Sequence, residues 1–136
     1  MLEVGRMEIR AGELSEPISH YTDAVKWGDT LFISGVAPVD RHGALVGPDD
    51  AVAQTRCILE NMGHVLSLSG ASFADVLKVT VYLTDIEDRI LIDPVRKEFF
   101  GETRPASTLI EVRNLAFEGM KVEIEAVAGI PGGGDG

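Results

Sequence analysis

Two short runs of alternating polarity near the end of the chain constrain the fold most. In residues 107–112, Ser107, Leu109 and Glu111 alternate with Thr108, Ile110 and Val112; in residues 121–128, Lys121, Glu123 and Glu125 alternate with Val122, Ile124, Ala126 and Ala128. Alternation with a period of two is typical of strands that bury one face. The runs therefore predict two strands joined by a loop around Gly119. We expect Glu123 and Glu125 to share one face, with Ser107 pointing toward them from the neighbouring strand.

Two helices and a further strand are predicted before these runs. Asp49 or Asp50 is suited to capping a helix that ends at Gly70, because apolar side chains recur there every three or four residues. Its core-facing stripe consists of Ala51, Thr55, Ile58, Met62, Val65 and Leu66. Residues 76–84 alternate as a strand, with Leu77, Val79, Val81 and Leu83 on one face and Thr80 and Tyr82 on the other. A second helix, with Ile92, Val95 and Phe99 as its apolar side, reaches Phe100 and is stopped by Gly101.

The first forty residues predict three shorter strands. These are residues 7–9, 21–25 and 30–36, with a turn at 27–29. Gly35 lies inside the third strand, which indicates a β-bulge or the close approach of another backbone.

The order of these elements predicts an α+β domain with a mixed sheet. Two helices of this length can cover only one face of that sheet. The other face, which carries Thr80 and Tyr82, is then solvated or buried elsewhere, and its intermediate polarity indicates an oligomer. We expect a single domain over residues 1–130 and a flexible glycine-rich tail over 131–136.

Composition and charge exclude several classes of function. The 136 residues include 22 acidic and 12 basic side chains, for a net charge of −10, which disfavours nucleic acid as a partner. The chain has no apolar run of about 18 residues, the length needed to cross a membrane. Its first residues lack the apolar stretch of a signal peptide, and Cys57 is the single cysteine. We therefore expect a cytoplasmic protein with no membrane partner.

Titratable side chains give a short set of candidates. His20, His42 and His64 show no metal-ligand spacing, so no metal site is predicted. His20 is typical of a surface histidine beside a turn, or it serves as a proton carrier next to Tyr21. Glu123 is either a solvated strand carboxylate or an acid–base group whose pKa Glu125 raises.

Seven segments, in this order, resemble the RidA/YjgF family of enamine and imine deaminases. They read ISHYTDAV, LFISGVAPVD, QTRCILENM, GASFADVLKVTVYLTDI, EFFG, RPASTLIEV and KVEIEAVA and extend from Ile18 to Ala128. The resemblance implies a chorismate-mutase-like fold, a homotrimer with clefts between subunits, and hydrolysis of small enamines or imines without metal or cofactor. The family's older name, endoribonuclease, fits neither the negative charge nor the absence of a basic patch.

The resemblance also implies roles for particular residues. Glu123 matches the glutamate that positions the attacking water, and Tyr21 matches a cleft tyrosine. Ser34 and Gly35 match a serine–glycine pair that shapes the cleft, and Asp93 takes a position that is often asparagine. His20 replaces part of the usual lead-in to the tyrosine.

One departure from the family pattern affects the substrate. Where relatives carry an arginine that binds the substrate carboxylate, this chain reads Pro105-Ala106-Ser107. A serine hydroxyl cannot replace the two-pronged guanidinium. Ser107 then contacts a different substrate, another cation such as Arg104 or Arg113 replaces the arginine, or the chemistry is lost. The leading hypothesis is a deaminase-type hydrolase of altered specificity, and the alternative is a trimer that binds a metabolite without turnover.

Overall fold

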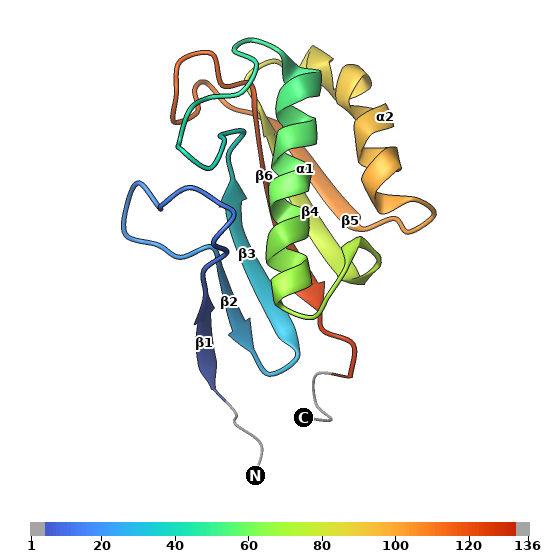
Figure 1. The fold of residues 1–136 in the computed structure, drawn as a ribbon. Helices are drawn as coiled ribbons and strands as arrows, with labels where there is room; N and C mark the ends of the chain where they lie inside the picture. The colour runs from blue at the N-terminus through green and yellow to red at the C-terminus, as the bar shows by residue number, and fades with distance from the viewer. Residues whose placement is uncertain (1–4, 133–136) are drawn as a thin grey trace.

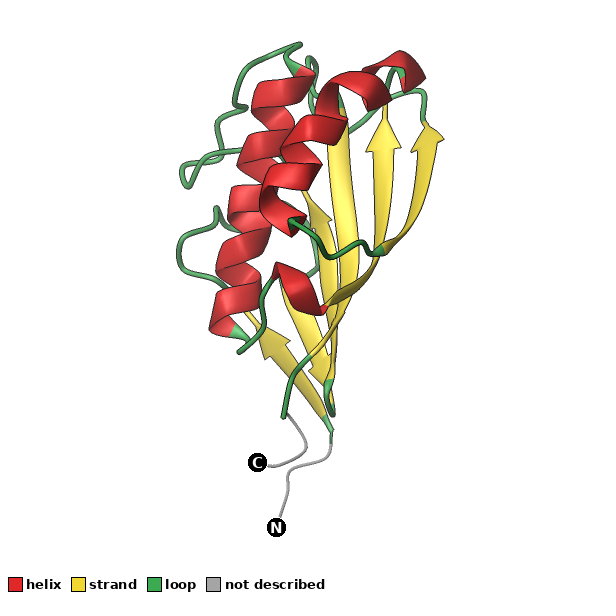
Figure 2. Cartoon of the chain, turned by 90° about the vertical axis from the view of Figure 1, so that its right-hand side faces the viewer, coloured by secondary structure: helices red, strands yellow, loops and turns green. Residues whose placement is uncertain are grey.

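The computed structural model describes residues 5–132 and shows a six-stranded mixed sheet with helices on one face (Figures 1 and 2). The strands are β1 (Arg6–Ile9), β2 (Ala24–Trp27), β3 (Thr30–Val36), β4 (Val76–Leu83), β5 (Ala106–Glu111) and β6 (Val122–Gly129). The helices are α1 (Ala51–Leu68) and α2 (Arg89–Phe100), with short 3-10 turns at Phe73–Asp75 and Ile86–Asp88. The predicted α+β class is confirmed. The expected glycine-rich tail lies outside the described residues, apart from Pro131 and Gly132.

The sheet order is β1-β2-β3-β6-β4-β5, so the last strand in sequence lies inside the sheet. β6 pairs antiparallel with both β3 and β4. β5 pairs with β4 alone and in parallel, which requires a crossover connection, and α2 forms it. One edge of the sheet is therefore β5, and α2 lies near it (Figure 1).

Helix α1 forms as its sequence predicts. The Asp50 carboxylate accepts a hydrogen bond from the Ala53 backbone N–H at 3.0 Å, which caps the first turn. Every residue of the predicted core-facing stripe is buried. Past the end of the helix, Gly70 has a φ of 80°, a left-handed conformation that favours glycine.

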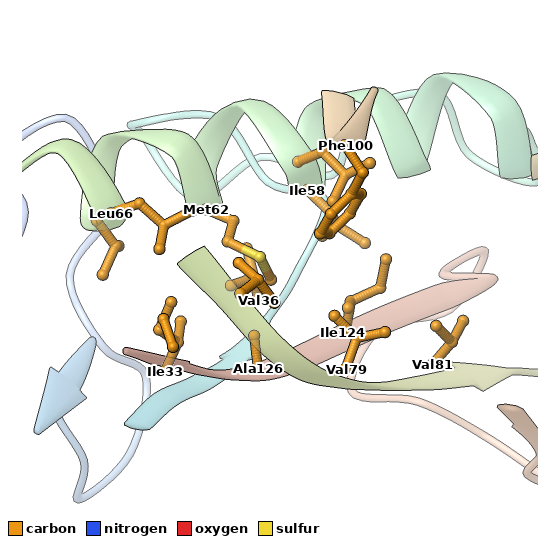
Figure 3. Packing of buried hydrophobic residues seen from close by; sticks show 14 of the residues in the cluster. Ile33, Val36, Ile58, Met62, Leu66, Val79, Val81, Phe100, Ile124 and Ala126 are labelled. Atoms are coloured by element: carbon orange, nitrogen blue, oxygen red, sulfur yellow. The ribbon is translucent and has the colours of Figure 1, made fainter. Parts of the chain in front are cut away.

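The core lies between α1 and the helix-facing side of the sheet (Figure 3). Ile58 and Met62 of α1 point toward Val36, Val79 and Ile124 of the sheet. Both helix residues are fully buried, so truncating either one to alanine is expected to cost about 2–5 kcal/mol of folding free energy. This layer holds β3, β4 and β6 in place beneath the helix.

Two sequence predictions are wrong in detail. β2 begins at Ala24 rather than at Tyr21, because the buried Asp23 side chain accepts from the Ala11 backbone N–H at 2.9 Å and pairs with Arg10. Leu77 is predicted to share a strand face with Val79, Val81 and Leu83, but those three are buried and Leu77 is 58% exposed. A register shift in the β4–β6 pairing between Val76 and Lys78 turns it away.

The second face of the sheet is not covered by any described helix or loop of the chain. Phe32 on β3, Trp27 on β2 and Ile110 on β5 are large apolar side chains that are exposed. Thr80 and Tyr82 of β4 belong to the same face, since they pair with Glu125 and Glu123. Among the described residues, neither helix has the length and apolar character needed to cross a membrane.

Candidate active site

An open cleft of about 390 Å³ lies where the segment before β2 meets β3 and the start of β6. Its lining includes Ser15, Ile18 and Tyr21 from that segment, Ser34 and Gly35 from β3, and Phe117 and Glu123 from the β6 side. This volume is within the range of small-molecule sites. The cleft therefore brings together four residues for which the resemblance implied a role: Tyr21, Ser34, Gly35 and Glu123.

Gly35 and Glu123 are in close contact at the base of this cleft. The β3–β6 register shifts between Ile33 and Val36, which confirms the predicted bulge. A Cβ atom built on Gly35 would lie 2.9 Å from Glu123 Cδ, well inside contact distance. Because Gly35 does not have a positive φ, glycine is needed here for space rather than for backbone conformation. The group that approaches Gly35 is thus a carboxylate, not a backbone.

The environment of Glu123 raises the pKa of its carboxyl group. Its side chain is half-buried, and burial is the main cause that raises the pKa of its carboxyl group. The negative charge of Glu125, on the same face of β6, raises that pKa further, as expected from the sequence. A carboxylate with a raised pKa is better suited than an ordinary glutamate to take a proton and return it.

Tyr21 and Ser34 differ in whether their hydroxyl groups are free to donate a hydrogen bond to a ligand. Ser34 Oγ donates to the Thr22 carbonyl oxygen at 2.6 Å, so its proton is already used within the fold. The Tyr21 hydroxyl oxygen lies 3.5 Å from the Ile18 backbone nitrogen, as an acceptor, and keeps its own proton. Tyr21 is also 47% exposed. It can therefore donate a hydrogen bond to a molecule in the cleft, whereas Ser34 shapes the wall.

Ser107 lies on the other side of the sheet, so the expectation that it points toward Glu123 is wrong within one chain. β4 separates β5 from β6. Ser107 pairs with Val79, a buried residue of the helix-covered face, whereas Glu123 pairs with Tyr82 on the uncovered face. Paired residues point to the same side of a sheet. The two side chains therefore leave opposite faces.

Asp93 and His20 also lie away from the cleft lining. Asp93 is an exposed residue of α2 that pairs with Lys97, one turn later, at 3.3 Å. His20 is exposed and does not line the cleft, although its neighbours Ser19 and Tyr21 do.

Arg96 is a candidate residue that sequence reasoning missed. Its Nη2 donates to Ser107 Oγ at 3.0 Å, which links α2 to the edge strand. The side chain is half-buried, and burial lowers the pKa of its guanidinium, an effect that Asp93 partly offsets. A signal was present, because Arg96 follows Ile92 by four residues and so borders the apolar stripe of α2. By contrast, Arg104 and Arg113 are both exposed.

The cleft itself is acidic. Glu16 and Glu123 both line it, and Glu16 lies 3.4 Å from Arg10 Nη2. No lysine, arginine or histidine is among the described residues of the lining. Within residues 5–132, no three histidine, cysteine or carboxylate side chains are grouped so as to hold a metal ion. A cation that binds an anionic group of a ligand would have to come from residues outside this lining.

Comparison with known proteins places the chain in a family. The profile described as Endoribonuclease L-PSP matches residues 13–130. A RutC family protein of Pyrococcus horikoshii is 42% identical over 113 residues, 83% of this chain and 89% of the relative. The 2-iminobutanoate/2-iminopropanoate deaminase of Capra hircus is 33% identical over 94% of this chain and 93% of its own. The crystal structure of E. coli TdcF with bound serine superposes with a TM-score of 0.83 at 33% identity, covering 90% of this chain and 98% of the other. The chain therefore belongs to the RidA/YjgF family, the family of the Endoribonuclease L-PSP profile.

Proposed function

We propose that this protein hydrolyses the C–N bond of small reactive imines and enamines and releases ammonia. The observation that carries the proposal is the half-buried Glu123 carboxylate, held against Gly35 in a cleft that Tyr21 also lines. A relative named 2-iminobutanoate/2-iminopropanoate deaminase supports the reaction class. No metal, cofactor or nucleic acid takes part in the proposed reaction.

The proposed reaction needs only acid–base help and positioning. Glu123 accepts a proton from a water molecule as the water oxygen bonds to the imine carbon. Glu123 then returns this proton to the nitrogen, which gives a carbinolamine. In a second transfer Glu123 takes the proton of the new hydroxyl group and delivers it to the nitrogen as the C–N bond breaks, so that ammonia leaves and a carbonyl product remains. Tyr21 donates a hydrogen bond that orients the substrate, and the Ser34–Gly35 wall keeps it beside Glu123. Since an imine carbon is already electrophilic, these contributions are sufficient.

We further propose that the working form is a cytoplasmic homotrimer that buries the uncovered sheet face. Phe32 is 49% exposed and Ile110 is 41% exposed in the single chain. Together with Tyr82 they give this face an apolar character, and burying such side chains between copies would stabilise an assembly.

The test couples an amino-acid oxidase, which generates 2-imino acids, to the measurement of ammonia release. We expect the wild-type protein to exceed the uncatalysed rate and Glu123→Gln to lose most of the gain. A matched control is Glu118→Gln, since Glu118 is exposed and is not part of the cleft lining. If no imine is turned over but a small amino acid or keto acid raises the Tm, the metabolite-binding alternative replaces the enzyme. The serine bound in the crystal structure of E. coli TdcF suggests serine as a first ligand with which to test that alternative.

A further inference from the structure

Arg96 carries a positive charge that no described carboxylate balances directly. Of the twelve lysine and arginine side chains, six form ion pairs within residues 5–132, and Arg96 is among the six for which no such pair is present there. The six that form pairs are Arg6, Arg10, Arg56, Arg89, Lys97 and Lys121. The side-chain partner of Arg96 is the hydroxyl of Ser107. Asp93 is the acidic residue that acts on it electrostatically, and Asp93 is itself paired with Lys97.

This charge is also partly removed from water. Arg96 is half-buried between α2 and β5, and removing a guanidinium from water is costly when only a neutral group replaces the water. An anion that approached Arg96 would offset that cost with charge-assisted hydrogen bonds. Ser107 is exposed, and its oxygen accepts from Arg96, so its own proton remains available to the same anion. The pair thus offers N–H and O–H donors at one place.

We propose that Arg96, together with Ser107, binds the carboxylate of the substrate. This inference rests on the proposed function, because it assigns the substrate class as imino acids or enamine acids rather than neutral imines. A guanidinium matches the planar, two-oxygen geometry of a carboxylate better than a single ammonium does. Since no lysine, arginine or histidine is among the described residues that line the cleft around Glu123, a cation for the carboxylate of such a substrate would come from outside that lining.

The position of Arg96 has a consequence for where one substrate can bind. Arg96 reaches Ser107 on the helix-covered side of the edge strand, whereas Glu123 lies on the uncovered side with β4 in between. A small imino acid cannot touch both groups of one chain. In the proposed trimer, Arg96 of one copy therefore acts on the same substrate as Glu123 of a second copy.

The experiment compares Arg96→Met, which removes the charge and keeps an apolar stem, with the wild-type protein. The probe is 2-oxobutanoate, the carbonyl product of 2-iminobutanoate hydrolysis, titrated by calorimetry, and 2-butanone is the matched probe without a carboxylate. We expect Arg96→Met to weaken 2-oxobutanoate binding about tenfold or more. Arg96→Lys should weaken it less, and 2-butanone should not distinguish the variants. Arg104→Met is the control for lost charge, since Arg104 is exposed near the same strand.

Binding and turnover separate this inference from the proposed function. Weaker 2-oxobutanoate binding in Arg96→Met supports the inference even if no imine is hydrolysed. Equal binding of 2-oxobutanoate by Arg96→Met and wild type, or no binding by either, overturns it, even if imines are hydrolysed. Where turnover is present, Arg96→Met should raise KM for 2-iminobutanoate more than it lowers kcat, because the contact is made in the bound substrate as well as in the transition state. A selective fall in kcat would contradict the assigned role.

Discussion

The carboxylate of Glu123 lies against Gly35 so closely that position 35 has no room for a side chain. Gly35 sits at a β-bulge in β3, and Glu123 begins the alternating face of β6. Because glycine occupies this bulge, the space that a side chain would fill is taken by the Glu123 carboxylate.

Gly35→Ala tests that relationship. The added Cβ would come within 2.9 Å of Glu123 Cδ, so Glu123 has to move while the backbone of β3 is unstrained. We expect the rate of imine hydrolysis to fall about tenfold or more, since displacing the proposed acid–base group is costly, with a much smaller change in Tm. Gly129→Ala is the matched control, because its Cβ would lie an ordinary 3.7 Å from Leu77 Cδ1. Equal activity in the two variants would show that Glu123 is not held by Gly35.

Glu123→Gln should raise stability at neutral pH. Burial raises the pKa of Glu123 above its unfolded value, so the ionised form destabilises the folded state. The variant therefore gains most over the wild type at pH values above the pKa that Glu123 has in the folded protein. The gain disappears at pH values below the pKa that Glu123 has in the unfolded chain. Thermal unfolding followed from acidic to neutral pH measures this. We expect a gain of about 2 °C or more in Tm near neutrality, and a gain that is the same at every pH would contradict the assigned cause.

Ser107→Arg should rescue Arg96→Met. Position 107 lies beside the place that the Arg96 guanidinium occupies, at 3.0 Å from Nη2, so an arginine there returns a cation to the same edge of β5. We expect the double variant to recover most of the 2-oxobutanoate affinity lost in Arg96→Met. Thr108→Arg in the same background is the control, because Thr108 pairs with Thr80 and so points to the opposite face of the sheet. Equal recovery in both would indicate a general charge effect.

Phe32→Glu should break up the proposed trimer. Phe32 is exposed on the uncovered face, and burying a charge there between copies costs more than exposing it in a monomer. Light scattering should show a trimer for the wild type and smaller species for the variant. Ile90→Glu on α2 is the control, since Ile90 is 65% exposed outside that face. A monomeric wild type at micromolar concentration would remove the shared cleft.

Mixing two impaired variants should restore activity at substrate concentrations well below KM. Arg96→Met and Glu123→Gln damage different groups, which in the proposed trimer act from different copies. Co-expression in equal amounts should return about a quarter of wild-type activity. Each site takes Arg96 from one copy and Glu123 from the next, and each of these groups is intact in half of the copies, so about one site in four has both. No recovery above the separately expressed variants would show that each chain acts alone.

The sequence predicted those parts of the fold that depend on nearby residues. Helix α1 was predicted because its cap at Asp50 and its apolar stripe are both local. Leu77 was misplaced because its direction depends on a register shift against β6, which is distant in the chain. Ser107 was misplaced for a related reason: two runs that are consecutive in sequence are separated in the sheet by β4. Arg96 was missed because its contact with Ser107 forms only when α2 packs beside β5, and local sequence patterns do not show that arrangement.

The parallel edge strand has a further consequence if the proposed trimer is the active form. A chain that has folded but has not yet met its copies presents the Arg96–Ser107 pair at one border and the Glu123 cleft on another surface. Such a chain would supply the Arg96–Ser107 part of one active site and the Glu123 part of another, and neither site would be complete. Activity per chain should then fall when the protein is diluted below the dissociation constant of the trimer. The protein would be active only at concentrations at which the trimer forms.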